Sequence, residues 1–509
     1  MRKFLVILFL IVAVLGVSNA QGGHKIKYRA DMGYYDEEVL NGAQRLIGNV
    51  AFAQDNVRGY CDSAYLYEQD NYIIAFGDKV KILVGDSVRL YGRRAYYDGD
   101  EKTASIAVNV RLEKGKAYLL TDSIIYNTKQ EVGYYLTGGK LINDKDTMTS
   151  QEGLYYTKTD IAIAKKNVLL WNDTYHVDCD SLKYNAASKI AYFISRTHLT
   201  SDEHEIFTTS GWYDTEHEIS TLAQDVQLFS GSQSMTADSV YYDRALRYGR
   251  GWNNATIVDT AKKYVVKGNY VEHHEKEGIS LATDSNLLVL IDDNQDSLFL
   301  HSDTIMVYFD EEHELQWARA YNKVKFYRED MQGACDSLAV LKEDSTLFMF
   351  YNPVIWTESY QLTGDTIRYM ALDSVNSQMD LIKAGFVVGS LYDDTEFNQI
   401  KGVNITGFLT DQNLYRVDVV GNAECVYYLQ EEDSTLIGIN TSMTSEMRVL
   451  LDSNKIQQIR FYDSPDGKVY PDEQFENKDR KLQDFRWLID YRPRNIMDLY
   501  VKPIPRYKD

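Results

Sequence analysis

Aspartates recur along the chain at intervals of 29–33 or 58–65 residues, and these carboxylates are the residues best placed to do chemistry. Each is followed by Ser or Thr, and the set consists of Asp62, Asp122, Asp180, Asp238, Asp303, Asp336 and Asp365. A ladder of carboxylates could supply oxygen ligands to calcium. Calcium-binding β-rolls use Gly-rich nonapeptide turns, which this sequence lacks, and Asp-Ser or Asp-Thr pairs also stabilise bends by bonding to their own backbone. The pattern favours structural bends over a metal site, and we expect no metal ion and no cofactor.

Motifs of the common catalytic and nucleotide-binding sites do not occur in the sequence. It contains no nucleophile elbow, phosphate-binding loop, zinc-binding helix motif or Gly-rich dinucleotide turn. A glycosidase would need two carboxylates about 5–10 Å apart in a cleft, and the 75 Asp and Glu residues leave that possibility open. No acidic pair departs from the repeating pattern, so we do not expect an enzyme.

The aspartates belong to a unit of about 30 residues that recurs from roughly Asn41 to Cys425. Each unit also carries an Asn-Val-like step with two apolar residues two positions apart. These pairs are Val50/Phe52, Val80/Ile82, Val110/Leu112, Val168/Leu170, Val226/Leu228, Val324/Phe326 and Val354/Trp356. Alternate residues of a strand face the same side of a sheet, and repeats of this length indicate stacked β structure. The pattern therefore predicts half-buried strands and an all-β fold.

The charge balance is acidic, with a formal net charge of −21. An acidic surface disfavours nucleic acid as a partner. The segment from Lys79 to Lys116 is the local exception, with nine Lys and Arg against five Asp and Glu. Charged strand edges commonly prevent aggregation, which is the simpler interpretation of this segment.

Three of the four cysteines directly precede a repeat aspartate. Cys61, Cys179 and Cys335 therefore occupy equivalent positions several units apart. Strands stack about 4.8 Å apart, so Cys61 and Cys179 lie well beyond the ~7 Å limit between the Cα atoms of a disulfide. We predict free thiols for these two residues.

The ends of the chain differ from the repeat body. Residues 1–20 have the charged, apolar and small-residue regions of a secretory signal peptide, so we expect export to the periplasm. Residues 21–40 form a lead-in and 41–428 the repeat body, in which a slip of the pattern near 265–300 marks the place where two halves would part. Residues 429–509 are expected to form a C-terminal cap or docking segment. Within it, Leu482, Phe485, Leu488 and Ile489 predict a short amphipathic helix from Asp479 to Asp490.

Several stretches of the first units resemble the OstA-like family. They are Leu46–Val50, Cys61–Tyr67, Ala75–Val80 and Leu90–Gly92. The likeness is clearest from about Arg29 to Leu170, and this chain is far longer than a single-domain member. The resemblance implies a β-jelly-roll folded like a taco, whose apolar interior shields lipid acyl chains. It also implies that strand edges join neighbouring transport-bridge or outer-membrane proteins.

The expected molecule is an elongated repeat β-jelly-roll that carries lipopolysaccharide or a related glycolipid through the periplasm toward the outer membrane, with which it could associate. The residues expected to line its lipid groove are Val50, Phe52, Ala64, Leu66, Val80, Ile82, Val110, Leu112, Ile124, Val168, Leu170 and Leu182. A filled core would have large residues at every inward position, whereas a groove leaves small ones such as Ala64 facing open space. Two other classes stay open: a structural or adhesive surface β-solenoid, and a carbohydrate-binding or carbohydrate-cleaving β-helix.

Overall fold

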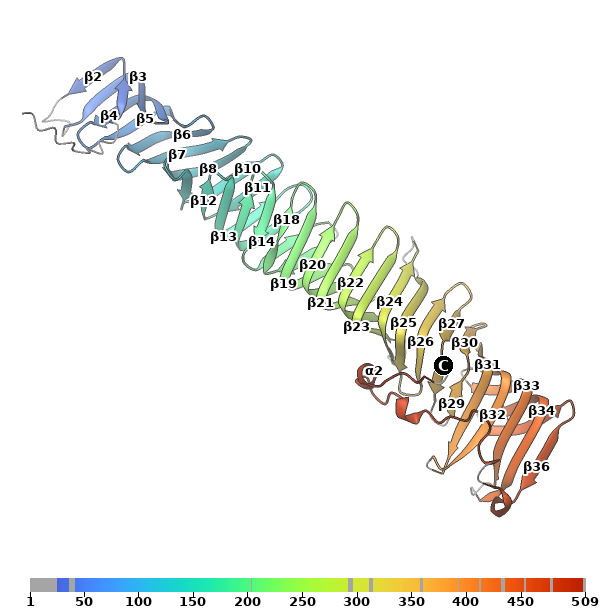
Figure 1. Ribbon diagram of the computed structural model, residues 1–509. Helices are drawn as coiled ribbons and strands as arrows, with labels where there is room; N and C mark the ends of the chain where they lie inside the picture. Colours follow the sequence, from blue (N-terminus) through green and yellow to red (C-terminus); the bar gives the residue numbers. More distant parts are fainter. Residues whose placement is uncertain are drawn as a thin grey trace, which may run out of the picture. The chain divides into compact units, whose positions relative to one another are not determined.

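The computed structural model describes residues 25–35, 42–202, 204–291, 296–310, 315–357, 360–392, 394–411, 413–431, 435–452, 455–476 and 479–506. The predicted signal peptide lies outside these residues, as does part of the predicted lead-in. The chain is an all-β protein in which strands that follow one another pair in antiparallel fashion (Figure 1). None of the described helices is long and apolar enough to cross a membrane.

The chain divides into two compact units. The first unit comprises residues 1–173 and 179–188, and the second comprises 174–178 and 189–509. The sequence predicts a break near 265–300. In the structure β22 and β23 pair there through nine residue pairs, which lie on either side of one bulge, from Tyr264 to His274.

In the first unit, long strands are followed by shorter ones. Its strands are β1 (Lys27–Arg29), β2 (Met32–Tyr35), β3 (Gln44–Gln54), β4 (Val57–Tyr67), β5 (Tyr72–Val84), β6 (Val88–Asp98), β7 (Thr103–Lys114), β8 (Ala117–Asn127), β9 (Val132–Tyr135), β10 (Gly139–Asn143), β11 (Asp146–Ser150), β12 (Glu152–Tyr156), β13 (Ile161–Trp171) and most of β14 (His176–Asn185).

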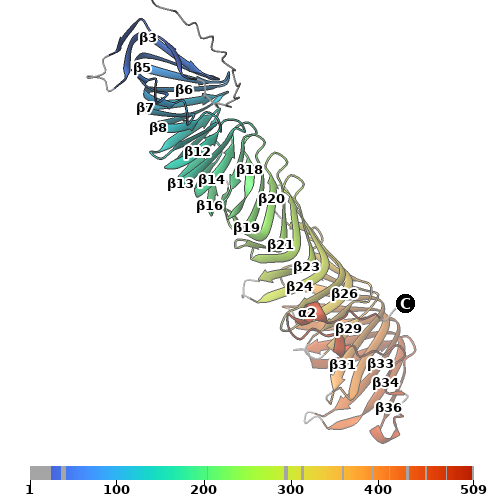
Figure 2. The same ribbon diagram turned by 60° about the vertical axis from the view of Figure 1, so that its left-hand side comes forward.

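The second unit continues the same hairpin pattern. Its strands are β15 (Ile190–Phe193), β16 (Thr197–Thr200), β17 (Glu205–Thr208), β18 (Ser210–Asp214), β19 (Ile219–Ser230), β20 (Gln233–Asp243), β21 (Tyr248–Asp259), β22 (Tyr264–His274), β23 (Ile279–Ile291), β24 (Ser297–Phe309), β25 (Leu315–Tyr327), β26 (Gln332–Leu341), β27 (Thr346–Phe350), β28 (Val354–Trp356), β29 (Tyr360–Thr363), β30 (Thr366–Ala371), β31 (Asn376–Leu391), β32 (Glu396–Thr410), β33 (Asn413–Gln430), β34 (Leu436–Asp452), β35 (Lys455–Tyr462) and β36 (Asp466–Tyr470). Within this unit the hairpins from β19 to β26 stack one beside the next (Figure 2).

Most long strands bend near their middle at a bulge, where the pairing register shifts, as between Ile47 and Val50 in β3. In β3, β7 and β13 the residue before the repeat Val is an Asn in the left-handed conformation, with φ of 45° at Asn49, 56° at Asn109 and 53° at Asn167. Asn tolerates this conformation better than most residues. The Asn-Val step of the sequence is therefore the bend of these three strands.

The repeat aspartates lie beside these bends. Asp62 accepts a hydrogen bond from the backbone N–H of Asp78 at 2.9 Å, which holds the bend of β5. In the second unit, Asn254 at the bend of β21 donates to Asp238 at 3.2 Å. Among the described residues, no group of three or more His, Cys, Asp or Glu side chains could hold a metal ion. The aspartates act as bend-stabilising acceptors.

The bends give each unit two walls. The first wall carries the residues that follow each repeat Val, such as Val50–Gln54. The second wall carries those that follow each repeat Asp, such as Ser63–Tyr67. The rings of Phe52 in the first wall and Tyr97 in the second stack with centroids 6.1 Å apart, so the inner faces of the walls meet.

All four cysteines are buried and carry free thiols, which confirms the prediction for Cys61 and Cys179. Burial raises the pKa of the Cys61 thiol to about 11. The thiol is therefore protonated at neutral pH and a poor nucleophile.

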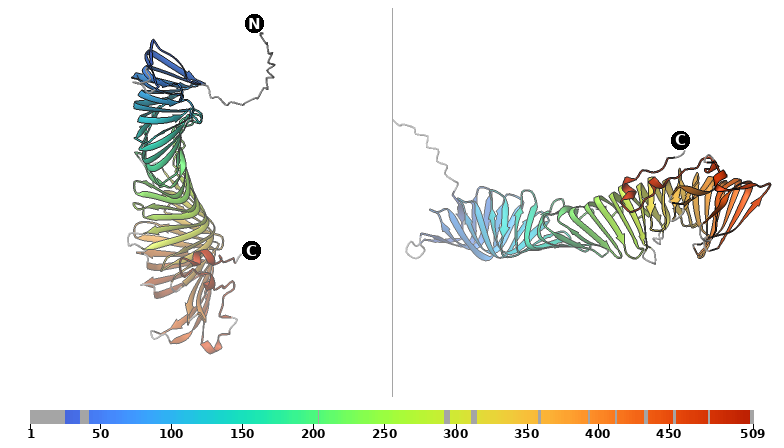
Figure 3. Two further views of the ribbon diagram at one scale, coloured as in Figure 1. Left: turned by 90° about the vertical axis from the view of Figure 1, so that its left-hand side faces the viewer. Right: turned by 90° about the horizontal axis from the view of Figure 1, so that it is seen from below.

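The C-terminal segment, residues 472–506, runs back across the outer face of the second unit's strands (Figure 3). It contains only short helical turns among its described residues: η1 (Asp472–Gln474), η3 (Ile489–Tyr491) and α2 (Asp498–Val501). The predicted helix from Asp479 to Asp490 is wrong, because its apolar residues dock onto separate places instead of one helical face. Leu482 packs with Tyr428, Phe485 with Phe397, and Leu488 with Trp356.

Buried glutamines fasten this segment to the sheet. The side-chain amide of Gln399 donates to the carbonyl of Arg480 at 2.7 Å and accepts from the N–H of Leu482 at 2.9 Å. Gln361 makes the same pair of bonds to Arg486 and Leu488, at 2.8 and 2.7 Å. Each amide thus satisfies backbone groups that would otherwise be buried without partners.

Candidate functional site

The twelve residues predicted for the lipid groove all lie on the inner faces of the first unit. Eight belong to the first wall and four, Ala64, Leu66, Ile124 and Leu182, to the second. None is more than 2% exposed. The structure therefore brings them together, but their own side chains fill the space between the walls, and their role toward a lipid stays a prediction.

Small inward residues do not leave open space in the first unit. Ala64, which a groove would leave facing a void, is only 1% exposed. Ala104 pairs with both Tyr97 and Tyr126, whose large rings flank it in the neighbouring strands. Small and large residues alternate across the second wall, so the layer closes.

Tyrosine hydroxyls join the two walls of the first unit. Tyr97 of the second wall donates to the Gln54 side chain of the first wall at 2.8 Å, and Tyr184 donates to Asp146 at 2.7 Å. Burial raises the pKa of Tyr97 to about 12. The Tyr97 phenol therefore stays neutral at physiological pH, and both hydroxyls act as donors across the gap.

The interior of the second unit is less completely filled. On its first wall the inward positions of successive strands pair as a continuous row, which we call the inner ladder: Leu228, Met235, Ile257, Val266 and Leu288. All five are only partly buried. The equivalent residues of the first unit, such as Ile82 and Leu170, are 0% exposed.

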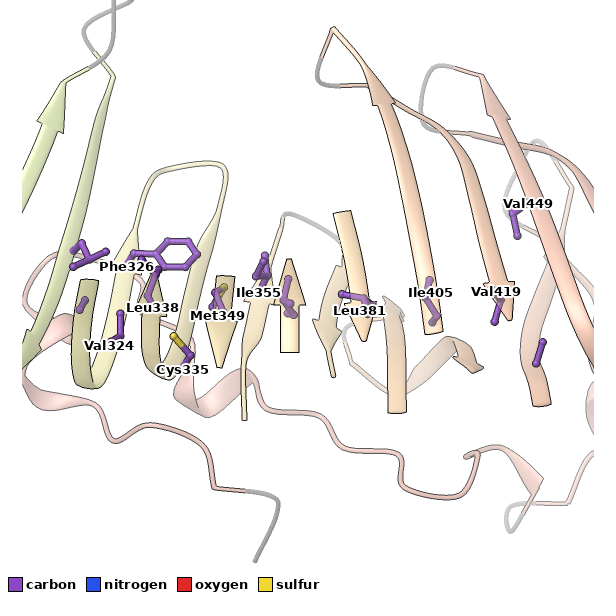
Figure 4. Close-up of a cluster of buried hydrophobic side chains, with 14 of the residues drawn as sticks. Val324, Phe326, Cys335, Leu338, Met349, Ile355, Leu381, Ile405, Val419 and Val449 are labelled. Atoms are coloured by element: carbon purple, nitrogen blue, oxygen red, sulfur yellow. The ribbon is translucent and has the colours of Figure 1, made fainter. Parts of the chain in front are cut away.

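At the bends of the second unit, the inward side chains are nevertheless buried. Val226, next to the bend of β19, is 1% exposed, and Ala255, next to the bend of β21, is also 1% exposed. Further along the second unit, Val324, Leu338 and Met349 belong to a buried apolar cluster (Figure 4). Partly buried apolar residues pack against this cluster. In the second unit the inward apolar side chains are therefore buried at the bends and only partly buried along the inner ladder.

Residues 219–291 contribute only apolar side chains to the inner ladder, with no acid, base or nucleophile in the row. Such a surface can hold hydrocarbon but cannot transfer protons or form covalent intermediates. The sequence already pointed to its start, since Val226/Leu228 is one of the repeat pairs. The predicted site stopped at Leu182 because the family resemblance is clearest only as far as Leu170.

Comparison with known protein families finds a match for part of the first unit. Residues 25–180 match the family model described as OstA-like protein. This region belongs to the OstA-like family. The OstA-like region includes eleven of the twelve predicted groove residues, and Leu182 lies just beyond its end.

A solved structure also resembles part of the chain. It is LptH from Pseudomonas aeruginosa, described as the LptA homologous periplasmic component of the conserved lipopolysaccharide transport device. The identity is 15%, the match covers 20% of this chain and 76% of LptH, and the TM-score is 0.19. No curated protein matches the sequence.

Proposed function

We propose that this protein binds the acyl chains of lipopolysaccharide or a related glycolipid and carries them through the periplasm toward the outer membrane. The inner ladder of the second unit is the observation that carries the proposal, because it presents partly exposed apolar side chains in an unbroken row. The OstA-like region supports the same class of function. No covalent chemistry is required of the protein.

The binding energy would come from removing hydrocarbon from water. Each buried CH₂ group contributes roughly 0.8 kcal/mol. Because neighbouring positions of the inner ladder are all aliphatic or thioether side chains, an acyl chain would find similar contacts from β19 to β23. Similar affinity along the row allows the lipid to slide.

The first unit would take part in a different way. Its twelve predicted groove residues are already buried, so an acyl chain could enter only if the walls separated. We propose that lipid contacts the half-exposed ladder first and that the OstA-like region opens only with lipid or with a partner protein at its strand edge.

Site-specific photocrosslinking tests the proposal. A photoreactive residue is placed at Leu288, on the inner face of β23, and in a matched control at Val289, its neighbour on the opposite face. Both positions are partly buried. We expect labelled lipopolysaccharide to crosslink at Leu288 and not at Val289, in cells that export the full chain.

Other outcomes point to the rival classes. Capture of glycan without acyl chains would support a carbohydrate-binding or carbohydrate-cleaving protein. Equal labelling at both positions, or none, would support a structural or adhesive solenoid. Photoreactive residues at Leu66 and Val80 ask separately whether the first unit opens.

A further inference from the structure

The outer face of the first wall in the first unit is basic, although the chain as a whole is acidic. Two rows of paired residues cross this face from β1 to β10. One row is Arg29, Ala51, Tyr60, Lys81, Tyr91, Arg111, Leu120 and Lys140, and the other is Lys27, Ala53, Arg58, Leu83, Arg89, Glu113, Tyr118 and Ile142. We call these sixteen residues the basic face.

Six of the seven cations of the basic face form no ion pair among the described residues. The rows hold seven Lys and Arg against one acid, Glu113, and among the described residues only Arg111 forms an ion pair, with Glu113 at 2.7 Å. Six of the seven are exposed, and Lys81 is partly buried. Like charges on neighbouring strands repel one another, so this face is suited to an external negative charge.

Aromatic side chains lie between the cations. The Nζ atom of Lys81 lies 6.0 Å from the centroid of the Tyr91 ring, and the Cζ atom of Arg111 lies 4.2 Å from the centroid of the Tyr118 ring. Tyr60 and Leu120 are exposed on the same face. At one end Lys27, Arg29 and Arg58 line a shallow cavity of about 250 Å³. Amphipathic rings beside cations are typical of the boundary between water and lipid headgroups.

We propose that the basic face docks on an anionic lipid surface. Eight strands at about 4.8 Å spacing make a face roughly 34 Å long, which presents its cations together to many headgroups. Each Lys or Arg near an anionic membrane adds to the attraction, and the attraction falls off within a Debye length. The proposed lipid contacts are inward side chains of the second unit, so docking through the outer face of the first unit uses different residues.

Vesicle binding of the full chain tests this docking. The probes are vesicles of phosphatidylglycerol with phosphatidylcholine, compared with phosphatidylcholine alone. The test variant carries Arg58→Glu, Arg89→Glu and Lys140→Glu, three exposed residues without acidic partners among the described residues. We expect the wild type to bind only the anionic vesicles, and the variant to bind them about 100-fold more weakly or worse.

A matched variant controls for net charge. Lys129→Glu, Lys158→Glu and Lys165→Glu change the charge of the same unit by the same amount, at exposed positions outside the basic face. This variant should lose little binding, because its charges do not meet the membrane. Circular dichroism and urea unfolding check that both variants are folded.

Three results would overturn the proposal. They are equal binding to neutral vesicles, an equal loss in the control variant, and no vesicle binding by the wild type. Capture of an acidic protein through the basic face, without vesicle binding, would assign the face to a protein instead. Photocrosslinking at Leu288 is independent of all these outcomes, so the two proposals can fail separately.

Discussion

The inner faces of the two units share one sequence pattern but differ in how completely they close. In the first unit the second wall presents Tyr97, Tyr126 and Tyr184 toward the first wall, and all three are buried. In the second unit the matching row runs through Tyr242, Gly249, His273, Ser280, Val307 and Ala318. Small or polar residues thus take several places where the first unit has tyrosines, and the interior there is less completely filled.

The largest expected effect comes from opening the first unit. Tyr126→Ala removes a ring that is 0% exposed, and deleting a buried aromatic side chain costs about 3–5 kcal/mol. Tyr126→Phe, which loses only the hydroxyl contact with Thr157, should cost about 1 kcal/mol. Urea unfolding measures both, and similar losses in the two variants would contradict a closed, ring-filled interior.

Matched leucines in the two units compare the interiors directly. Leu170→Ala in the first unit should lower the free energy of unfolding by about 3 kcal/mol, since this side chain is fully buried. Leu288→Ala in the second unit should cost about 1 kcal/mol, because its side chain is already partly in water. Hydrogen exchange of the backbone amides in each unit measures the loss of stability locally. If the two losses are equal, the second unit is as tightly filled as the first.

Alkaline pH should weaken the closure of the first unit. The pKa values of Tyr97 and Tyr126 are raised to about 12 by burial, above the ordinary value of 10.0. The fold therefore favours the neutral phenols, and the stability they contribute is complete below pH 10 and is lost as the pH rises through 12. We expect a loss on the order of 2 kcal/mol from each residue.

The control for this pH dependence is the double variant Tyr97→Phe and Tyr126→Phe. It lacks both titrating groups, so its unfolding free energy between pH 10 and 12 should fall less steeply than that of the wild type. An unchanged slope would assign the alkaline transition to other groups.

The smallest change in stability is expected from closing the second unit. Ser280→Tyr introduces a ring on the second wall, where the wall of the first unit carries tyrosines, and a partly exposed site should absorb it at less than about 1 kcal/mol. The ring should cover the ladder and reduce lipid crosslinking at Leu288. Undiminished crosslinking, with a folded variant, would mean that the lipid does not pass this strand.

The sequence was enough to predict the strands and the free thiols of Cys61 and Cys179, because these depend on the repeat register. The bend of β3 at Asn49 was not predicted, since the spacing of apolar residues does not report a positive φ. Closure of the interior could not be predicted, because Phe52 and Tyr97 meet across the walls although they lie in separate strands. The apolar spacing of Leu482 to Ile489 suggested a helix, but the hydrophobic patches that receive these residues come from distant strands.

The C-terminal segment has a consequence for the order of folding. Its contacts run from Tyr428 in β33 back to Trp356 in β28, and Lys325 in β25 donates to the carbonyl of Lys502. Every surface that it covers is built from residues synthesised earlier. This segment can therefore dock only after the preceding hairpins have assembled. A chain without this segment would expose the side chains of Trp356 and Phe397. Proteases could recognise these exposed apolar side chains and so distinguish incompletely folded molecules from folded ones.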